Sequence, residues 1–241
     1  MLRKLLLLII LIVFAKCGLA LVVDSVSGKD GCSYRVNNTS GQVIKVNRFG
    51  VVEASYSSFS FPQGIAVDDN DNIYVADTGG KKVVQLHDEG KSFKYVKTFR
   101  VPNDSWEPTK LRWNKNGSLY VTDSQNKKIW KFNLDGSFNE VFIGDSKMLS
   151  FGIDGRATKA FRNYGLAIDQ SGDIYIANTF QNSIQKYSVE GKLLMDLGIR
   201  GTGKLKFINT KDIVIDPNGN LYVADTGNNR VQKIDAQGKF K

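Results

Sequence analysis

Four acidic or amide residues recur at one position along the chain and are the first candidates for chemistry. They are Asp77, Asp123, Asn178 and Asp225, and each follows a short apolar run and precedes Thr or Ser. A group of carboxylates can bind a cation or act in acid–base catalysis. Recurrence at one position of a repeat favours a structural function, because Asp and Asn side chains accept backbone N–H groups in turns. We interpret these residues as turn caps.

A second acidic segment, Asp68-Asp-Asn-Asp-Asn72, has the composition of a calcium loop. The EF-hand loop requires glycine at its sixth position and glutamate at its twelfth. Counted from Asp68, those positions hold Ile73 and Gly79. We interpret the segment as a polar hairpin turn. No metal or cofactor is expected, and bound Ca²⁺ is an alternative that the sequence does not support.

Histidine and cysteine, the usual zinc ligands and partners in nucleophilic catalysis, are scarce. The 241 residues include one histidine, His87, and two cysteines, Cys17 and Cys32. These residues leave almost nothing for a zinc site or a catalytic Cys/His pair. No segment resembles a Gly-rich phosphate loop or a Gly-x-Ser-x-Gly nucleophile elbow. The residue types therefore weaken most enzyme hypotheses.

Composition excludes other classes of protein. Hydrophobic residues make up 41% of the chain and aromatic residues 11%, which excludes a disordered chain. With 4 Pro and 23 Gly the chain is neither collagen-like nor a proline-rich polymer. The formal net charge of +9 leaves a basic surface available to an anionic partner.

A repeated unit of roughly 47 residues must position the candidate residues. Its marker tyrosines are separated by 40, 46, 55 and 47 residues: Tyr34, Tyr74, Tyr120, Tyr175 and Tyr222. A complete unit reads as four short strands separated by turn residues, for example 64–68, 72–77, 82–86 and 93–99. Four antiparallel strands repeated at this period are typical of a β-propeller.

We therefore predict an all-β fold, a five-bladed propeller or an incomplete six-bladed ring. The expected domain covers residues 21–241. Its units are approximately 21–58, 61–99, 106–143, 161–197 and 207–241. The first strand of the first unit could only be Leu19–Asp24, which overlaps the end of the predicted signal peptide, and a fourth strand is also expected at Phe138–Ile143.

Three segments carry a family resemblance: Gly64-Ile-Ala-Val-Asp68, Ile73-Tyr-Val-Ala-Asp-Thr78 and Gly227-Asn-Asn-Arg-Val-Gln232. They resemble NHL repeats, and the resemblance extends over roughly residues 34–240. One copy departs from the pattern, with Arg112 and Trp113 where the family prefers small apolar residues. The resemblance implies a β-propeller that acts as a binding module.

Other activities of NHL-type propellers are also implied by the resemblance. Peptidyl-hydroxyglycine lyases hold zinc with several histidines, a set that His87 alone cannot provide. Calcium-dependent propeller lactonases use Glu and Asn in the central channel, and no feature of this sequence identifies such a set. Some NHL propellers bind RNA on a positive face, but an exported protein seldom meets RNA, so we expect no nucleic-acid partner.

The predicted topology brings the turns between second and third strands to the same end of the sheets as the connections between units. Long loops on a rigid scaffold are the usual place for binding. We name this end the basic loop face, with its cations Lys81, Lys82, Lys127, Lys128, Arg156, Arg200, Lys204 and Arg230, and the apolar anchors Trp106 and Phe180. We predict that it binds an acidic protein segment, an anionic glycan or a membrane surface. A solvated face that only keeps the protein soluble is the alternative.

The N-terminus predicts export. Residues 1–20 combine a basic start, an apolar run from Leu5 to Ala15 and a small-residue cleavage site, as a signal peptide does. The alternative is an uncleaved membrane anchor, which must tolerate Lys16. Cleavage would remove three basic residues and lower the net charge from +9 to +6. Cys32 would then be the only thiol.

The sequence thus predicts a secreted or otherwise extracytoplasmic, non-catalytic binding propeller with a protein or anionic partner. The alternative is a propeller hydrolase or lyase with a metal in its central channel.

Overall fold

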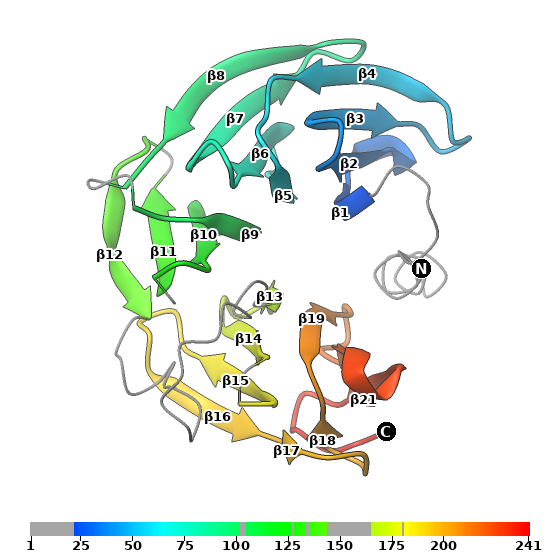
Figure 1. Cartoon of the computed structure of the whole chain (residues 1–241), viewed down its shortest axis with the longest axis vertical. Helices are drawn as coiled ribbons and strands as arrows, with labels where there is room; N and C mark the ends of the chain where they lie inside the picture. The colour runs from blue at the N-terminus through cyan, green and yellow to red at the C-terminus, as the bar shows by residue number, and fades with distance from the viewer. Residues whose placement is uncertain (1–21, 102–104, 127, 134, 144–164, 180) are drawn as a thin grey trace. The chain divides into compact units, whose positions relative to one another are not determined.

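The computed structural model describes residues 22–101, 105–126, 128–133, 135–143, 165–179 and 181–241 (Figure 1). Regular structure in these residues is β-strand, apart from two three-residue 3-10 turns, Lys29–Gly31 and Thr226–Asn228. In this part of the chain no helix has the length and apolar character to cross a membrane. The predicted signal peptide, residues 1–20, lies outside the described residues.

The strands form two compact units, which divide inside β12 between Glu140 and Val141. The first unit contains three sheets in which consecutive strands pair antiparallel. Their bounds are β1 Val22–Ser27, β2 Ser33–Asn37, β3 Gln42–Val46 and β4 Val52–Ser57; β5 Pro62–Val67, β6 Asn72–Asp77, β7 Lys82–Asp88 and β8 Phe93–Phe99; β9 Pro108–Asn114, β10 Ser118–Asp123, β11 Lys128–Asn133 and β12 Phe138–Ile143.

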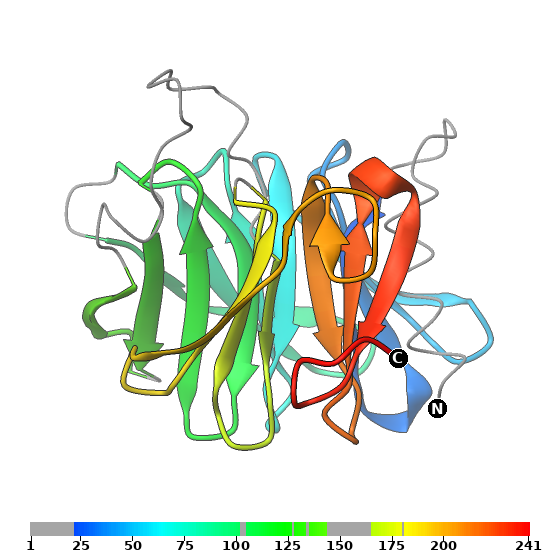
Figure 2. The same cartoon turned by 90° about the horizontal axis from the view of Figure 1, so that it is seen from below.

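The second unit contains one four-stranded and one three-stranded antiparallel sheet, with a two-stranded parallel ladder in the connection between them. The bounds are β13 Gly165–Ile168, β14 Ile174–Asn178, β15 Ser183–Tyr187 and β16 Leu193–Leu197; β17 Ile199–Arg200 and β18 Lys206–Phe207; β19 Thr210–Ile215, β20 Leu221–Asp225 and β21 Arg230–Ile234. Figure 2 shows the strands of each sheet from the side, with turns at both ends.

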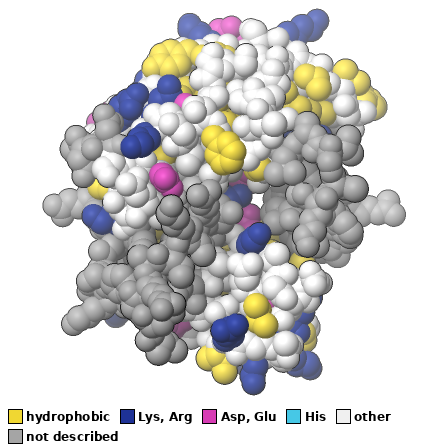
Figure 3. All heavy atoms as spheres, in the orientation of Figure 1, with side chains coloured by type: hydrophobic (Ala, Val, Ile, Leu, Met, Phe, Trp, Pro, Cys, Tyr) yellow, Lys and Arg dark blue, Asp and Glu magenta, His cyan; other side chains and the backbone are white. Residues whose placement is uncertain are grey.

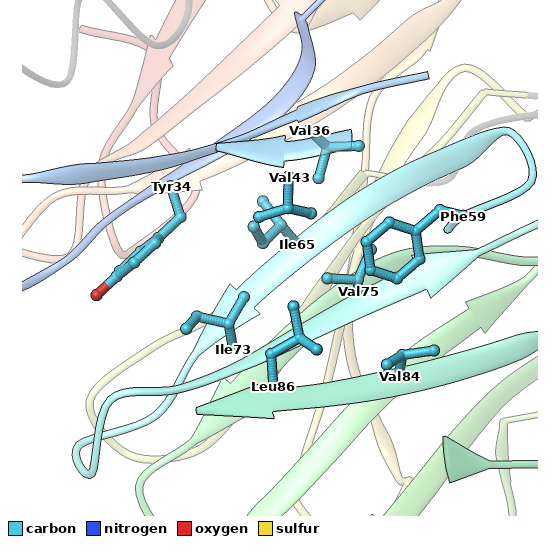
Figure 4. Packing of buried hydrophobic residues seen from close by; sticks show 9 residues of the cluster. All are labelled: Tyr34, Val36, Val43, Phe59, Ile65, Ile73, Val75, Val84 and Leu86. Atoms are coloured by element: carbon cyan, nitrogen blue, oxygen red, sulfur yellow. The ribbon is translucent and has the colours of Figure 1, made fainter. Parts of the chain in front are cut away.

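Neighbouring sheets within a unit pack face to face through small and β-branched residues. Figure 4 shows Val36 and Val43 of the first sheet beside Ile65 of the second, in one buried cluster. The first strands approach so closely that glycine is required: a Cβ built on Gly64 would lie 2.2 Å from the carbonyl oxygen of Thr109. In the second unit, a Cβ on Gly165 would lie 2.4 Å from the Cα of Asp212.

The all-β fold class is confirmed, since the described residues form five blade-like antiparallel sheets. The strand expected at Leu19–Asp24 is displaced: β1 runs from Val22 to Ser27, because its pairing with β2 places Tyr34 opposite Val26. The ladder of β17 and β18 was not predicted, because two-residue strands leave no periodic signal.

Candidate functional site

The turn between second and third strands meets the connection from the preceding sheet at one end of three sheets. In the second sheet the amide of Gly79 donates to the carbonyl of Ser60, with an N···O distance of 2.7 Å. Ser124 donates in the same way to Glu107 at 3.0 Å, and Gly227 to Ile208 at 2.7 Å. Each of these three sheets therefore has a loop end where two segments of the chain are held together.

Buried carboxylates complete these junctions. Asp77 Oδ1 accepts the amide of Ser60 at 2.6 Å, Asp123 Oδ1 that of Glu107 at 3.1 Å, and Asp225 Oδ1 that of Ile208 at 2.8 Å. The connection and the turn thus bond reciprocally, and the loop end is rigid. Asn178 Oδ1 accepts the amide of Gln181 within its own turn at 3.0 Å.

The second carboxylate oxygen binds side chains on the following strand. Asp225 Oδ2 accepts Arg230 Nε at 2.7 Å and Gln232 Nε2 at 3.0 Å. Asp123 Oδ2 accepts Trp130 Nε1 at 3.0 Å. Asp77 Oδ2 lies 3.5 Å from Lys82 Nζ. Burial raises the pKa of Asp77, and the amides of Ser60 and Gly80 together with the Lys82 ammonium only partly oppose that rise.

These internal contacts occupy several cations of the basic loop face. Lys82 pairs with Asp77, Lys128 lies over the Trp130 ring at 5.8 Å, and Arg230 pairs with Asp225. The Arg230 guanidinium also donates to the carbonyls of Thr202, Gly203 and Lys206. The charges of Lys82 and Arg230 are therefore compensated by carboxylates of their own sheets.

Lys81, Arg200 and Lys204 are exposed at the loop ends of their own sheets. Lys204 Nζ lies 5.0 Å from the centre of the Phe240 ring. Lys127, Arg156 and Phe180 lie outside the described residues. In Figure 3 the Lys and Arg side chains of the face in view are scattered in separate groups.

Trp106 requires a correction, because we expected it to be an exposed apolar anchor. The side chain is fully buried, and its Nε1 donates to the carbonyl oxygen of Lys81 at 2.7 Å. It packs on Phe132, with 5.9 Å between ring centres. Trp106 therefore supports the turn that carries Lys81 and is not available to a partner.

Charged residues on the first strands were not predicted from the sequence. Asp24 of β1 and Lys110 of β9 are both buried, and Lys110 Nζ lies 3.4 Å from Asp24 Oδ2. The same oxygen accepts the amide of Ile65 at 3.3 Å. In the alignment of the repeats, Lys110 occupies the position of Gly64 in the second sheet, so the alignment already showed an unusual lysine at this position. Spacing alone did not show that this position is buried.

His87 and the acidic Asp68–Asn72 segment take part in turn contacts. His87 Nδ1 lies 3.1 Å from Asn72 Oδ1, which pairs the two strands β6 and β7. Asp68 Oδ1 accepts the amides of Asn70 and Asn72 at 2.8 and 2.9 Å in the turn between β5 and β6. The described residues contain no group of three or more His, Cys, Asp or Glu able to hold a metal ion.

The NHL repeat family model matches residues 59–86 and 211–234, which contain β5 to β7 and β19 to β21. The chain therefore carries NHL repeats in both units. No curated protein matches this NHL-repeat chain in sequence.

Solved structures share the propeller fold. A streptogramin B lyase is 17% identical with a TM-score of 0.71, over 92% of this chain and 68% of its own. A catalytically inactive His-to-Ala variant of virginiamycin B lyase from Staphylococcus aureus, solved with quinupristin, is 16% identical with a TM-score of 0.70, over 94% of this chain and 70% of its own. An auxiliary nutrient binding protein from Bacteroides ovatus is 15% identical with a TM-score of 0.68, over 90% of this chain and 60% of its own. At these identities the likeness shows the fold alone.

Proposed function

We propose that this NHL-repeat protein is a non-catalytic binding module that presents its basic loop face to an anionic protein segment or glycan outside the cytoplasm. One observation supports the proposal in each unit by itself: in the first unit Lys81 is exposed while Lys82 pairs with Asp77, and in the second unit Arg200 and Lys204 are exposed while Arg230 pairs with Asp225. A loop backbone that is already held in place loses little conformational entropy on binding, which favours a preorganised site. The N-terminal residues 1–20 support export.

Charge reversal tests the proposed face. The triple variant Lys81→Glu, Arg200→Glu, Lys204→Glu should elute from a heparin column at lower salt than the wild type, because these cations contact the sulfates. The matched control is Lys115→Glu, Lys192→Glu, Lys239→Glu, whose exposed lysines lie at the opposite ends of their sheets. Both variants change the net charge equally. Equal shifts in elution would contradict the proposal, since they would report net charge alone.

An enzyme is the alternative function, favoured by the lyase structures among the similar folds. In the virginiamycin B lyase solved with quinupristin, a histidine is replaced by alanine and the protein is catalytically inactive. In this chain the single histidine, His87, lies on the third strand of its sheet and contacts Asn72. Thermal unfolding with added Ca²⁺ or Zn²⁺ and incubation with quinupristin separate the two functions. A binding module should show no specific rise in Tm and no consumption of quinupristin by chromatography; either effect would favour the enzyme.

A further inference from the structure

A pocket of about 570 Å³ lies within the first unit, at the opposite end of the strands from the basic loop face. Its walls come from the 3-10 turn Lys29–Gly31, the turn between β3 and β4, and the turns before β6 and after β7. The volume falls within the range of small-molecule sites. The pocket is independent of the proposed function, because it shares no residue with the basic loop face.

Phe49 makes this pocket different from the corresponding turns of the other sheets. Turns with the same two backbone hydrogen bonds occur at 47–51, 133–137, 188–192 and 235–239. The third residue of the turn is Asp135, Glu190 or Gln237 in three of them and Phe49 in the first. The Phe49 side chain is 76% exposed and lines the pocket. Contiguous exposed apolar residues are typical of binding surfaces, and Val51 and Val52 beside Phe49 are exposed as well.

The residue after the turn glycine is also apolar in this turn and polar in the other three. Ser137, Lys192 and Lys239 follow their glycines in the other turns, whereas Val51 follows Gly50 here and is also exposed. Figure 3 shows hydrophobic side chains gathered at the upper right, over the turn between β3 and β4 in Figure 1. The fold tolerates polar residues at both positions, so blade architecture does not explain the apolar ones.

The turn that carries Phe49 is held in place without a ligand. Asn47 Oδ1 accepts the amides of Phe49 and Val51, both at 3.0 Å. Asn47 Nδ2 donates to Glu53 Oε1 at 3.0 Å, which ties the turn to β4. The Arg48 guanidinium lies 4.8 Å from the centre of the Phe49 ring. A fixed turn reduces the entropy lost when a ligand stacks on the ring.

Polar groups in the pocket are arranged as donor–acceptor pairs. Lys29 Nζ lies 2.9 Å from Asp71 Oδ2, and Lys45 Nζ lies 2.8 Å from Asp88 Oδ2. Asn47 and Glu53 form a third pair. Lining lysines and arginine are matched in number by lining carboxylates, so the pocket has no excess charge to select an ion. Burial acts to raise the pKa of Asp88, but hydrogen bonds from Lys45 and Tyr34 lower it overall, so this carboxylate is charged at neutral pH.

A hydroxyl group both donates and accepts hydrogen bonds, so it can bind beside each of these pairs. An aromatic ring at the mouth offers a flat apolar surface to the C–H face of a sugar ring. We propose that this pocket binds a neutral saccharide, which stacks on Phe49 and hydrogen-bonds to the Asn47–Glu53 and Lys45–Asp88 pairs.

An array of neutral glycans, followed by saturation-transfer NMR titration of the glycans it identifies, tests this proposal on the full chain. The variant Phe49→Asp installs the residue that Asp135 provides in the equivalent turn, so the turn should still form. We expect its affinity for the glycan to fall by about fivefold or more, because the stacking surface is lost. Glu53→Gln should also weaken binding, because it removes a carboxylate acceptor.

Phe61→Asp is the matched control. Phe61 is also an exposed phenylalanine of the first unit, but it does not line the pocket. This variant should bind the glycan as the wild type does. The proposal is overturned if no neutral glycan binds, or if Phe49→Asp binds as tightly as the wild type. It is also overturned if only sulfated or uronic glycans bind, or if lipid vesicles bind through Phe49 while glycans do not. Loss of heparin binding in the loop-face variant would leave glycan binding unchanged, so the two proposals can fail separately.

Discussion

Asp225 shows how one buried side chain can organise a loop end. It is fully buried, and its two oxygens accept the amide of Ile208, the side-chain amides of Asn228 and Gln232, and the guanidinium of Arg230. Four donors surround the carboxylate, one at Oδ1 and three at Oδ2. The carboxylate is thereby compensated without bulk water, as a buried charge must be.

Asp225→Ala should therefore destabilise the protein strongly. The substitution leaves the Ile208 amide, the Gln232 side-chain amide and the partly exposed Arg230 guanidinium without this acceptor, and a buried group left unsatisfied costs about 1–3 kcal/mol. Urea unfolding followed by circular dichroism measures the change. Asp235→Ala is the control: Asp235 caps an exposed turn through the amides of Gln237 and Lys239, so we expect a loss of about 1 kcal/mol or less. Equal losses would contradict the account.

Recurrence along the sequence was enough to interpret Asp225 as a turn cap, since a site residue rarely repeats in every unit. The partners of the carboxylate could not be predicted. Ile208 and Asn228 come from different segments, and no rule of spacing joins them. Trp106 shows the same limit, because its place in a long connection between units favoured an exposed anchor, whereas the folded protein buries it next to the Lys81 carbonyl. The pocket beside Phe49 could not be predicted from the sequence either, because residues of four separate turns line it.

At the scale of elements, the glycines of the first strands set how closely two sheets approach. Gly64 of β5 faces the backbone of β9, and a Cβ at this position would meet the carbonyl oxygen of Thr109 at 2.2 Å. The obstacle is backbone, which cannot rotate away as a side chain can.

Gly64→Ala should lower the free energy of unfolding by about 1–3 kcal/mol, because the added methyl overpacks the contact between β5 and β9. Gly203→Ala is the matched control, since a Cβ there meets only carbons of the flexible Lys206 side chain, at 3.6 Å or more. We expect the control to lie within about 0.5 kcal/mol of the wild type. Urea unfolding of both variants measures the difference, and a Gly64→Ala protein as stable as the control would refute the close packing of β5 on β9.

Strand positions were the most predictable part of the elements. The fourth strands expected at 93–99 and 138–143 coincide with β8 and β12. Strand positions follow from the local sequence, in which runs of β-branched residues alternate with turn residues. The first strand of the first sheet, β1, lies farther along the chain than predicted. Its position depends on pairing with β2, which begins at Ser33, eleven residues after the start of β1, so the local sequence pattern does not determine it.

At the scale of the whole molecule, buried tyrosines recur in both units and share one electrostatic property. Burial raises the pKa values of Tyr34, Tyr74, Tyr175 and Tyr187 above 10, the ordinary value for tyrosine. Nearby carboxylates raise them further: the hydroxyl of Tyr34 donates to Asp88 at 2.6 Å, and that of Tyr74 to Asp68 at 3.0 Å. The folded state therefore requires these hydroxyls to stay protonated in both units.

Alkaline pH should consequently unfold the protein. For Tyr187, burial first and the charge of Asp196 second raise the pKa to about 12. Below pH 10 the hydroxyl is protonated in both states and the full stability is present. As the pH rises from 10 to about 12, the unfolded state loses the proton while the folded state retains it, so the free energy of unfolding falls.

Tyr187→Phe removes this group, so the free energy of unfolding of the variant should fall less steeply over that interval. The difference between the falls of wild type and variant should reach up to about 3 kcal/mol. Urea titrations at stepped pH measure both slopes; Tyr56→Phe, at a half-buried tyrosine, is the control and should follow the wild type. Parallel curves for wild type and Tyr187→Phe would show that a buried Tyr187 is not what limits stability in alkali.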